Sequence, residues 1–105
     1  MTIYEEIEAE CARQDVKWGE QNHPMVYKDH FTFPHDYVHH AKGERDYCDA
    51  RFKEGTGSWE LILNEEVAEA YEQAALGNDS KLREELIQVA AVVVAMIDCL
   101  ERNGL

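Results

Sequence analysis

The chain has few of the residues that interrupt or cross-link a fold. It contains only two prolines, and its three cysteines, Cys11, Cys48 and Cys99, are an odd number without the spacing of metal ligands. A disulfide framework is therefore not expected, and the cysteines are predicted to be free, mostly buried thiols.

Positive charge is also scarce, with 10 Lys and Arg against 22 Asp and Glu and a formal net charge of −12. Such a surface repels a phosphate backbone, which argues against a protein that binds nucleic acid polymers in general. An anionic ligand would need a cation as intermediary.

The sequence contains no signal for a membrane. No basic segment precedes an apolar run at the start, and the apolar run after Gln88 is too short to cross a bilayer. We therefore expect a cytoplasmic protein without a membrane segment.

What the chain does contain is typical of a folded protein, with 45% hydrophobic and 30% charged residues. Helical spacing of apolar residues recurs, and Thr2 with Glu5 fits a capping box, while Ser58 is suited to cap a later helix. The sequence predicts an all-α fold, a bundle of about four helices in a single domain over residues 1–105. The expected helices cover about residues 2–15, 35–54, 59–76 and 81–102, with a long ordered loop over 18–34.

The last predicted helix is unusually apolar, because Gln88 is its only polar residue between Leu86 and Ile97. A helix that is apolar on every side needs neighbours on every side. Three other short helices cannot enclose it, so we expect residues 89–97 to lie both in the core and at an interface with another subunit. The chain is therefore predicted to form a homo-oligomer, either a homodimer or a homotetramer.

Two pairs of polar side chains lie on the apolar stripes of the last two predicted helices. Glu66 and Glu69 are three residues apart and share a helix face, and Glu85 with Gln88 repeats this spacing after the turn. If the two helices pack antiparallel, the pairs face each other and form an oxygen-lined pocket. Carboxylate and amide oxygens suit Mg²⁺ or Mn²⁺. The alternative is a solvated acidic face without a ligand.

These residues also resemble a known family. "EEVAE" at residues 65–69, followed by "EELIQ" at residues 84–88, is similar to the EExxE and ExxD motifs of the MazG-like all-α NTP pyrophosphatases. The flanking words "RQDVKWGEQNHP", "GTGSWELILNEEVAEA" and "LREELIQVAAVVVAMID" resemble a small single-domain branch of that family, so the resemblance covers most of the chain.

The resemblance implies a helical bundle assembled as a dimer or tetramer. It also implies Mg²⁺-dependent hydrolysis of a nucleoside or deoxynucleoside triphosphate to the monophosphate and pyrophosphate. By motif position, Glu66, Glu69 and Glu85 would be metal ligands and Glu65 a further acidic member of the site, with either Glu65 or Glu69 accepting the proton of the attacking water. Gln88 departs from the pattern, which has Asp there, although its carbonyl can still ligate a cation.

Two further groups are candidates for substrate binding. Gln14, Trp18 and Gln21 offer an aromatic face beside amides, which suits a nucleobase, although Trp18 could equally anchor the loop by packing. The cations, namely Arg45, Arg51 and Lys53, could meet phosphate oxygens or could simply be solvated.

The sequence is also compatible with a second function. The chain could be a non-catalytic helical module that binds nucleotides or proteins, having kept the fold while Gln88 replaced an essential acid.

Overall fold

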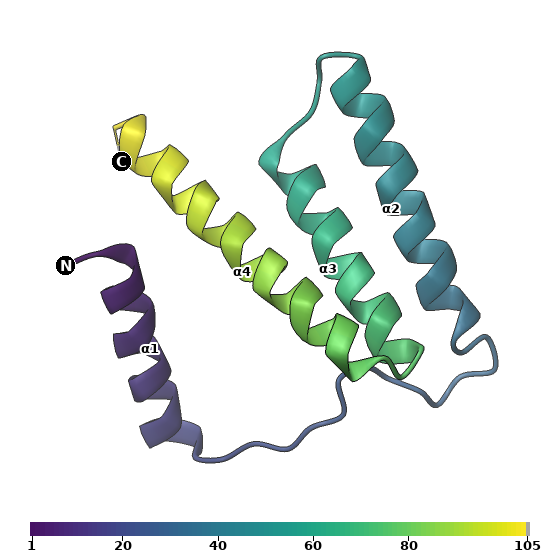
Figure 1. Ribbon diagram of the computed structural model, residues 1–105, viewed down its shortest axis with the longest axis horizontal. Coiled ribbons are helices and arrows are strands. Elements are labelled where there is room, and N and C mark those ends of the chain that lie inside the picture. The colour runs from purple at the N-terminus through teal and green to yellow at the C-terminus, as the bar shows by residue number, and fades with distance from the viewer. Residues whose placement is uncertain (105) are drawn as a thin grey trace.

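Four α-helices and their connecting segments make up residues 1–104, the part of the chain that the computed structural model describes (Figure 1). The helices are α1 (Ile3–Trp18), α2 (His35–Lys53), α3 (Trp59–Ala75) and α4 (Asp79–Arg102). No β-strand occurs in residues 1–104. The prediction of an all-α fold with four helices is confirmed.

The helix boundaries follow from the capping residues. Thr2 and Glu5 form the predicted capping box, and the Ser58 side chain accepts a hydrogen bond from the Leu61 N–H at the start of α3. α4 begins two residues earlier than predicted because the Asn78 side chain caps it. α1 continues to Trp18, beyond the predicted end near Asp15, and stops where Gly19 adopts a φ of +67°.

α3 lies in the middle of a layer of three helices, with α2 packed on one side and α4 on the other (Figure 1). α3 and α4 form an antiparallel hairpin around the turn at Gly77. A core cluster lies at this turn and consists of Val26, Ala70, Ala74, Ala75 and Leu82, with Phe33, Tyr37 and Val89 packed against it. Three of the five buried residues are alanines, which allow the helix axes to approach closely.

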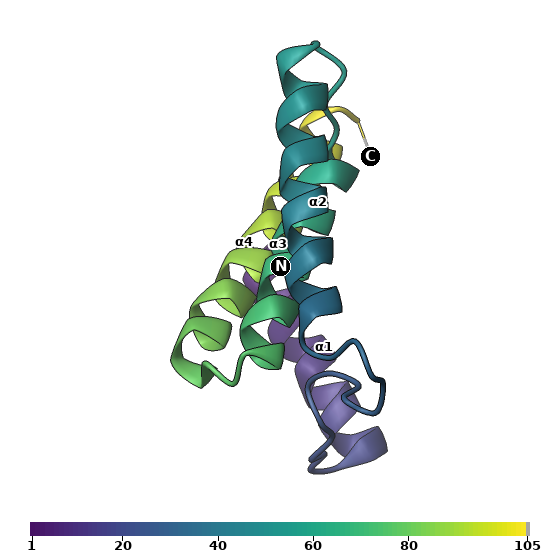
Figure 2. The same ribbon diagram turned by 90° about the vertical axis from the view of Figure 1, so that its right-hand side faces the viewer.

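α1 lies across α4 from α3 (Figure 1), and its C-terminal end projects beyond the other helices (Figure 2). None of its residues is buried. The radius of gyration is 16.1 Å, whereas a compact domain of this length has about 13 Å. The accessible surface is 7923 Å², against about 6,000 Å² for a compact monomer of this mass. The single chain is therefore open rather than closed around one core.

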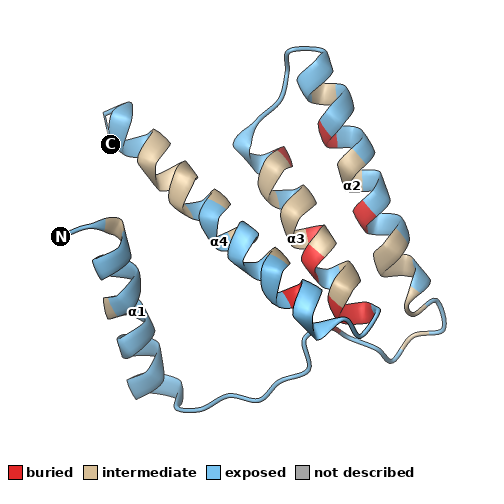
Figure 3. Ribbon diagram, viewed as in Figure 1, coloured by how far each residue is buried: buried red, intermediate tan, exposed pale blue. Residues whose placement is uncertain are grey.

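The outer part of α4 differs from the sequence prediction. Leu82 is the only buried residue of α4, and every residue from 89 to 97 is half-buried or exposed (Figure 3). The prediction that residues 89–97 lie in the core is wrong for the single chain, because α1 does not close over α4 and α3 covers only one side of it. Among residues 1–104, none of the four helices combines the length and the hydropathy that a membrane-spanning helix needs.

Candidate metal centre

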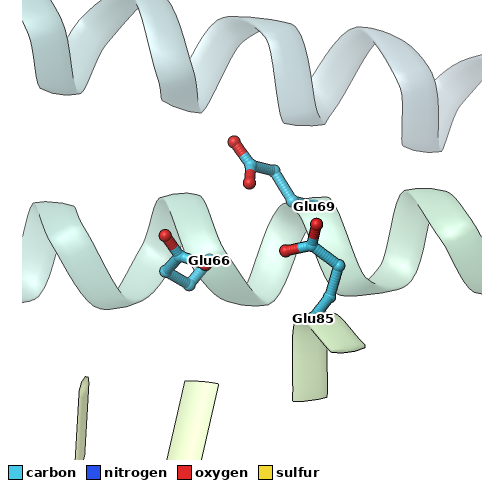
Figure 4. A group of neighbouring side chains, drawn as sticks. All are labelled: Glu66, Glu69 and Glu85. Carbon is cyan, nitrogen blue, oxygen red and sulfur yellow. The ribbon is translucent and has the colours of Figure 1, made fainter. Parts of the chain in front are cut away.

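Three glutamates from two helices converge beside the core. Glu66 and Glu69 project from α3 and Glu85 from α4, and a carboxylate oxygen of each lies within 4.8 Å of the others (Figure 4). All three residues are half-buried. The structure thus brings together the three residues that the sequence assigned as carboxylate ligands.

The antiparallel hairpin explains this convergence. Glu69 precedes Gly77 by eight residues and Glu85 follows it by eight, so the two lie at the same level of adjacent helices. Glu85 also lies between Leu82 and Val89 on the face of α4 that packs on the core. Glu66 is one turn from Glu69 on α3, which places it beside the same contact.

The carboxylates lie in an environment that disfavours their negative charge. Burial, and then the neighbouring carboxylates, raise the pKa of Glu66 and of Glu85 above the ordinary glutamate value. One carboxylate oxygen of each, Oε2, is buried and accepts no hydrogen bond from the described protein atoms. Two buried acceptors without donors, beside a third carboxylate, form a donor set that fits a hard divalent cation.

Arg45 on α2 is a positively charged residue that contacts this cluster. Its Nε donates to Glu69 Oε1 at 3.2 Å, and its Nη2 lies 3.9 Å from Glu72 Oε1. The hydrogen bond to Glu69 is the main cause that raises the pKa of Arg45. Arg45 therefore holds the Glu69 carboxylate in place, a contact that differs from both alternatives given for Arg45 above, phosphate oxygens or solvent.

Glu65 lies beside Glu69 and also contacts Cys48 on α2. Burial raises the pKa of its carboxyl, and a hydrogen bond with the Cys48 thiol opposes that shift. Burial, together with this contact, raises the pKa of the Cys48 thiol to about 11. Cys48 is buried and free, as expected, whereas Cys11 is exposed and Cys99 half-buried. Only the fold reveals the Cys48–Glu65 pair, because the two residues are on different helices.

The predicted base-binding residues lie away from the acidic cluster in the single chain. Gln14 and Trp18 line a hollow of about 290 Å³ on α1, where Lys17 Nζ lies 4.9 Å from the Trp18 ring centroid. Gln21, in the loop, contacts His23. α1 is separated from α3 by α4 (Figure 1), so the role of these residues in substrate binding stays a prediction.

Arg51 and Lys53, at the end of α2, do not contact the glutamate cluster. The Arg51 guanidinium lies over the Tyr47 ring at 5.8 Å, and its Nε is buried without an acceptor. Arg51 lines a polar hollow of about 380 Å³ with Thr56 and Asn64. Lys53 is exposed. Their proposed contact with phosphate oxygens stays a prediction.

Gln88, one turn after Glu85, is exposed in the single chain. Its proximity to Glu85 on α4 follows from helical spacing, and its role as a fourth ligand stays a prediction.

Comparison with known proteins gives no relative for this chain: no family model, no curated protein and no solved structure matches it. The features of the chain that bear on its function are therefore the acidic residues, their geometry and the resemblance of the two glutamate motifs.

Proposed function

We propose that the protein is a Mg²⁺-dependent nucleoside triphosphate pyrophosphohydrolase, which converts a nucleoside or deoxynucleoside triphosphate to the monophosphate and pyrophosphate. The observation that carries the proposal is the triad of Glu66, Glu69 and Glu85, two of which keep a buried oxygen without a hydrogen-bond donor. The resemblance of the two glutamate motifs supplies the substrate class. Mn²⁺ is an alternative cation with the same ligand preference.

The three carboxylates would hold the cation, and a bound divalent ion supplies charge neutralisation for phosphate oxygens and acidifies water. Arg45 orients Glu69 through its Nε hydrogen bond. Glu65 lies outside the triad, so its carboxylate is not occupied as a metal ligand, which favours it over Glu69 as the proton acceptor for the attacking water. The negative surface of the chain, with its net charge of −12, makes a cation necessary for binding a triphosphate.

We place the reaction in the cytoplasm, where nucleoside triphosphates are abundant, and in a homodimer or homotetramer. The open shape of the single chain and its accessible surface of 7923 Å² support assembly.

The experiment is a panel of the common nucleoside and deoxynucleoside triphosphates, incubated with the protein in Mg²⁺, in Mn²⁺ and in EDTA. Release of pyrophosphate and monophosphate in equal amounts, abolished by EDTA, is the expected result. Release of inorganic phosphate alone, or no product with any nucleotide, would contradict the proposal.

One observation favours a second function. Gln88 stands where the resemblance has Asp, which removes one negative charge from the candidate metal site. A non-catalytic module that binds nucleotides or another protein would tolerate this change. In the same panel, such a module would bind a nucleotide without turnover.

A further inference from the structure

Trp59, the first residue of α3, borders an open hollow instead of packing in the core cluster. The residue is 37% exposed, and the hollow, of about 490 Å³, lies between the start of α3 and the end of α4. We call this space the Trp59 hollow. Its other lining residues are Met96, Cys99, Leu100, Asn103 and Gly104. The volume falls within the range of small-molecule sites, roughly 300–1,000 Å³, so the hollow has room for a ligand.

The Trp59 hollow lies on the same stripes of α3 and α4 as the glutamate triad. Trp59 and Glu66 are seven residues apart on α3, which places them on one side of the helix and about 10.5 Å apart along its axis. On α4, Glu85 and Met96 are eleven residues apart, which is about three turns and again puts both on one side. The triad and the hollow therefore follow one another along the same helix pair.

A ligand held by the triad has room along this helix pair in one direction only. Toward the α3–α4 turn, the core cluster fills the space between the helices, with Ala70, Ala74 and Leu82 buried. Away from the turn, α3 and α4 diverge (Figure 1), and the Trp59 hollow opens between their far ends. An elongated ligand that extends from the triad along the two helices therefore reaches the Trp59 hollow.

The lining of the hollow suits a flat, largely apolar ring with polar edges. The indole offers a face on which a nucleobase stacks, and Met96 and Leu100 add apolar contacts. The Asn103 side chain donates through Nδ2 to the Cys99 carbonyl oxygen at 2.7 Å, which leaves Oδ1 as an acceptor for an N–H group on the edge of a base. None of the lining residues is charged, so the hollow offers a phosphate group no partner.

We infer that the Trp59 hollow receives the base of a nucleoside triphosphate whose phosphates lie at the glutamate triad, an assignment that rests on the function proposed above. The base stacks on the indole, and Asn103 Oδ1 accepts a hydrogen bond from its edge. The sugar and the phosphates span the two turns of α3 between Trp59 and Glu66. Base recognition then belongs to α3 and α4 instead of α1 and the loop after it, since α4 separates α1 from the triad in the single chain (Figure 1).

Kinetics of single-residue variants test this assignment. With the best substrate of the nucleotide panel, Trp59→Ala should lower kcat/KM by about 5- to 150-fold, the effect of removing one side chain that stacks on a base. Trp59→Phe keeps an aromatic face and should lose less. Tyr71→Ala is the matched control, because Tyr71 is another exposed aromatic residue of α3 that does not line the hollow, and it should keep the wild-type kcat/KM. Mg²⁺ should raise the melting temperature of Trp59→Ala as much as that of the wild type, which distinguishes a lost base contact from a damaged triad.

Tryptophan fluorescence tests the same contact without turnover. The chain has two tryptophans, Trp18 and Trp59. In the presence of Mg²⁺, a nucleoside triphosphate should quench the fluorescence of the wild type, whereas Trp59→Phe, which retains only Trp18, should not respond. Inorganic tripolyphosphate carries the phosphates without a base and should quench neither protein.

The two tests distinguish failure of the base site from failure of the proposed reaction. Pyrophosphate release with wild-type kinetics in Trp59→Ala, or quenching that persists in Trp59→Phe, would overturn the base site and leave the reaction standing. Quenching that requires both the base and Trp59, without pyrophosphate release from any nucleotide, would overturn the reaction and leave the base site standing. If no nucleotide quenches the wild type, the base site is overturned whatever the kinetics. If Trp59→Ala does not fold, Trp59→Phe provides both measurements.

Discussion

Two faces of α4 differ in what they contact: an inner seam with Leu82, Glu85 and Val89, which faces the core and the acidic cluster, and an outer seam with Leu86, Val93 and Leu100. On the inner seam, Leu82 is 6% exposed and Glu85 joins the acidic cluster. On the outer seam, Leu86, Val93 and Leu100 contact solvent over 38 to 55% of their surface. One helix thus builds the candidate site on one side and presents an apolar surface on the other. The stability of the site in the single chain comes from the small cluster at the α3–α4 turn.

Truncation of a leucine on each seam should give the largest contrast. Leu82→Ala removes a buried side chain from the core cluster and should lower the free energy of unfolding by about 3 kcal/mol. Leu100→Ala should cost less than about 1 kcal/mol at protein concentrations too low for association, because Leu100 is 55% exposed. Urea unfolding at low and high protein concentration measures both. Equal losses at low concentration would contradict the difference between the seams.

Neutralising the inner-seam carboxylate should abolish activity without unfolding the chain. Glu85→Gln, or Glu69→Gln on α3, should lower Mg²⁺-dependent turnover by at least about 100-fold, since loss even of outer-sphere metal partners costs 10- to 100-fold. The melting temperature of the metal-free protein should stay the same or rise, because repulsion between carboxylates is relieved. The matched control is Glu84→Gln, exposed and adjacent on α4, which should retain turnover. Wild-type turnover in Glu85→Gln would remove Glu85 from the site.

The acidic cluster should also make the metal-free protein less stable as the pH rises. Because the folded-state pKa values of Glu66 and Glu85 are raised above the ordinary 4.5, the folded state binds more protons than the unfolded state just above that pH. The free energy of unfolding therefore falls as the pH rises from the ordinary value to the raised values, and this contribution is constant above them.

Denaturant unfolding in EDTA between about pH 5 and pH 8 measures this contribution. Glu66→Gln should make the decrease shallower, while Glu101→Gln, an exposed position near the end of α4, should leave it unchanged. If the free energy of unfolding increased with pH in this range, equally for the wild type and for Glu66→Gln, the pKa values of the cluster would not be raised in the folded state.

Gln88 should produce the smallest effect, since it is exposed and one turn beyond Glu85. Gln88→Asp adds a carboxylate and should lower the Mg²⁺ concentration for half-maximal turnover, because ligand charge helps to set cation affinity. Gln88→Leu cannot ligate and should raise that concentration. Mg²⁺ titrations of turnover for both variants provide the measurement. Identical titrations for the two variants and the wild type would exclude Gln88 as a ligand.

The sequence was sufficient to predict features that depend on neighbouring residues or on one hairpin. The caps at Thr2 and Ser58, and the convergence of Glu66, Glu69 and Glu85, follow from helical spacing and a short turn. The Arg45–Glu69 ion pair was not predicted, because it depends on how α2 is rotated against α3.

The position of α1 was not predicted for a similar reason. Its apolar spacing indicates that it packs against something but does not identify the surface. Residues 89–97 were predicted to lie in the core and at a subunit interface, and in the single chain they are half-buried or exposed. An apolar run does not distinguish a core helix from a helix with one open face, since both require the same side chains.

The central claim is that the glutamate triad binds Mg²⁺, and stabilisation of the protein by the ion tests it most directly. Thermal unfolding of the wild type, Glu85→Gln and Glu84→Gln should be followed from EDTA to millimolar Mg²⁺ at constant ionic strength. The account predicts that Mg²⁺ at tenfold its dissociation constant stabilises the wild type and Glu84→Gln by about 1.4 kcal/mol and leaves Glu85→Gln unchanged. An equal response of all three proteins, or no response of the wild type to Mg²⁺ or Mn²⁺, would contradict it.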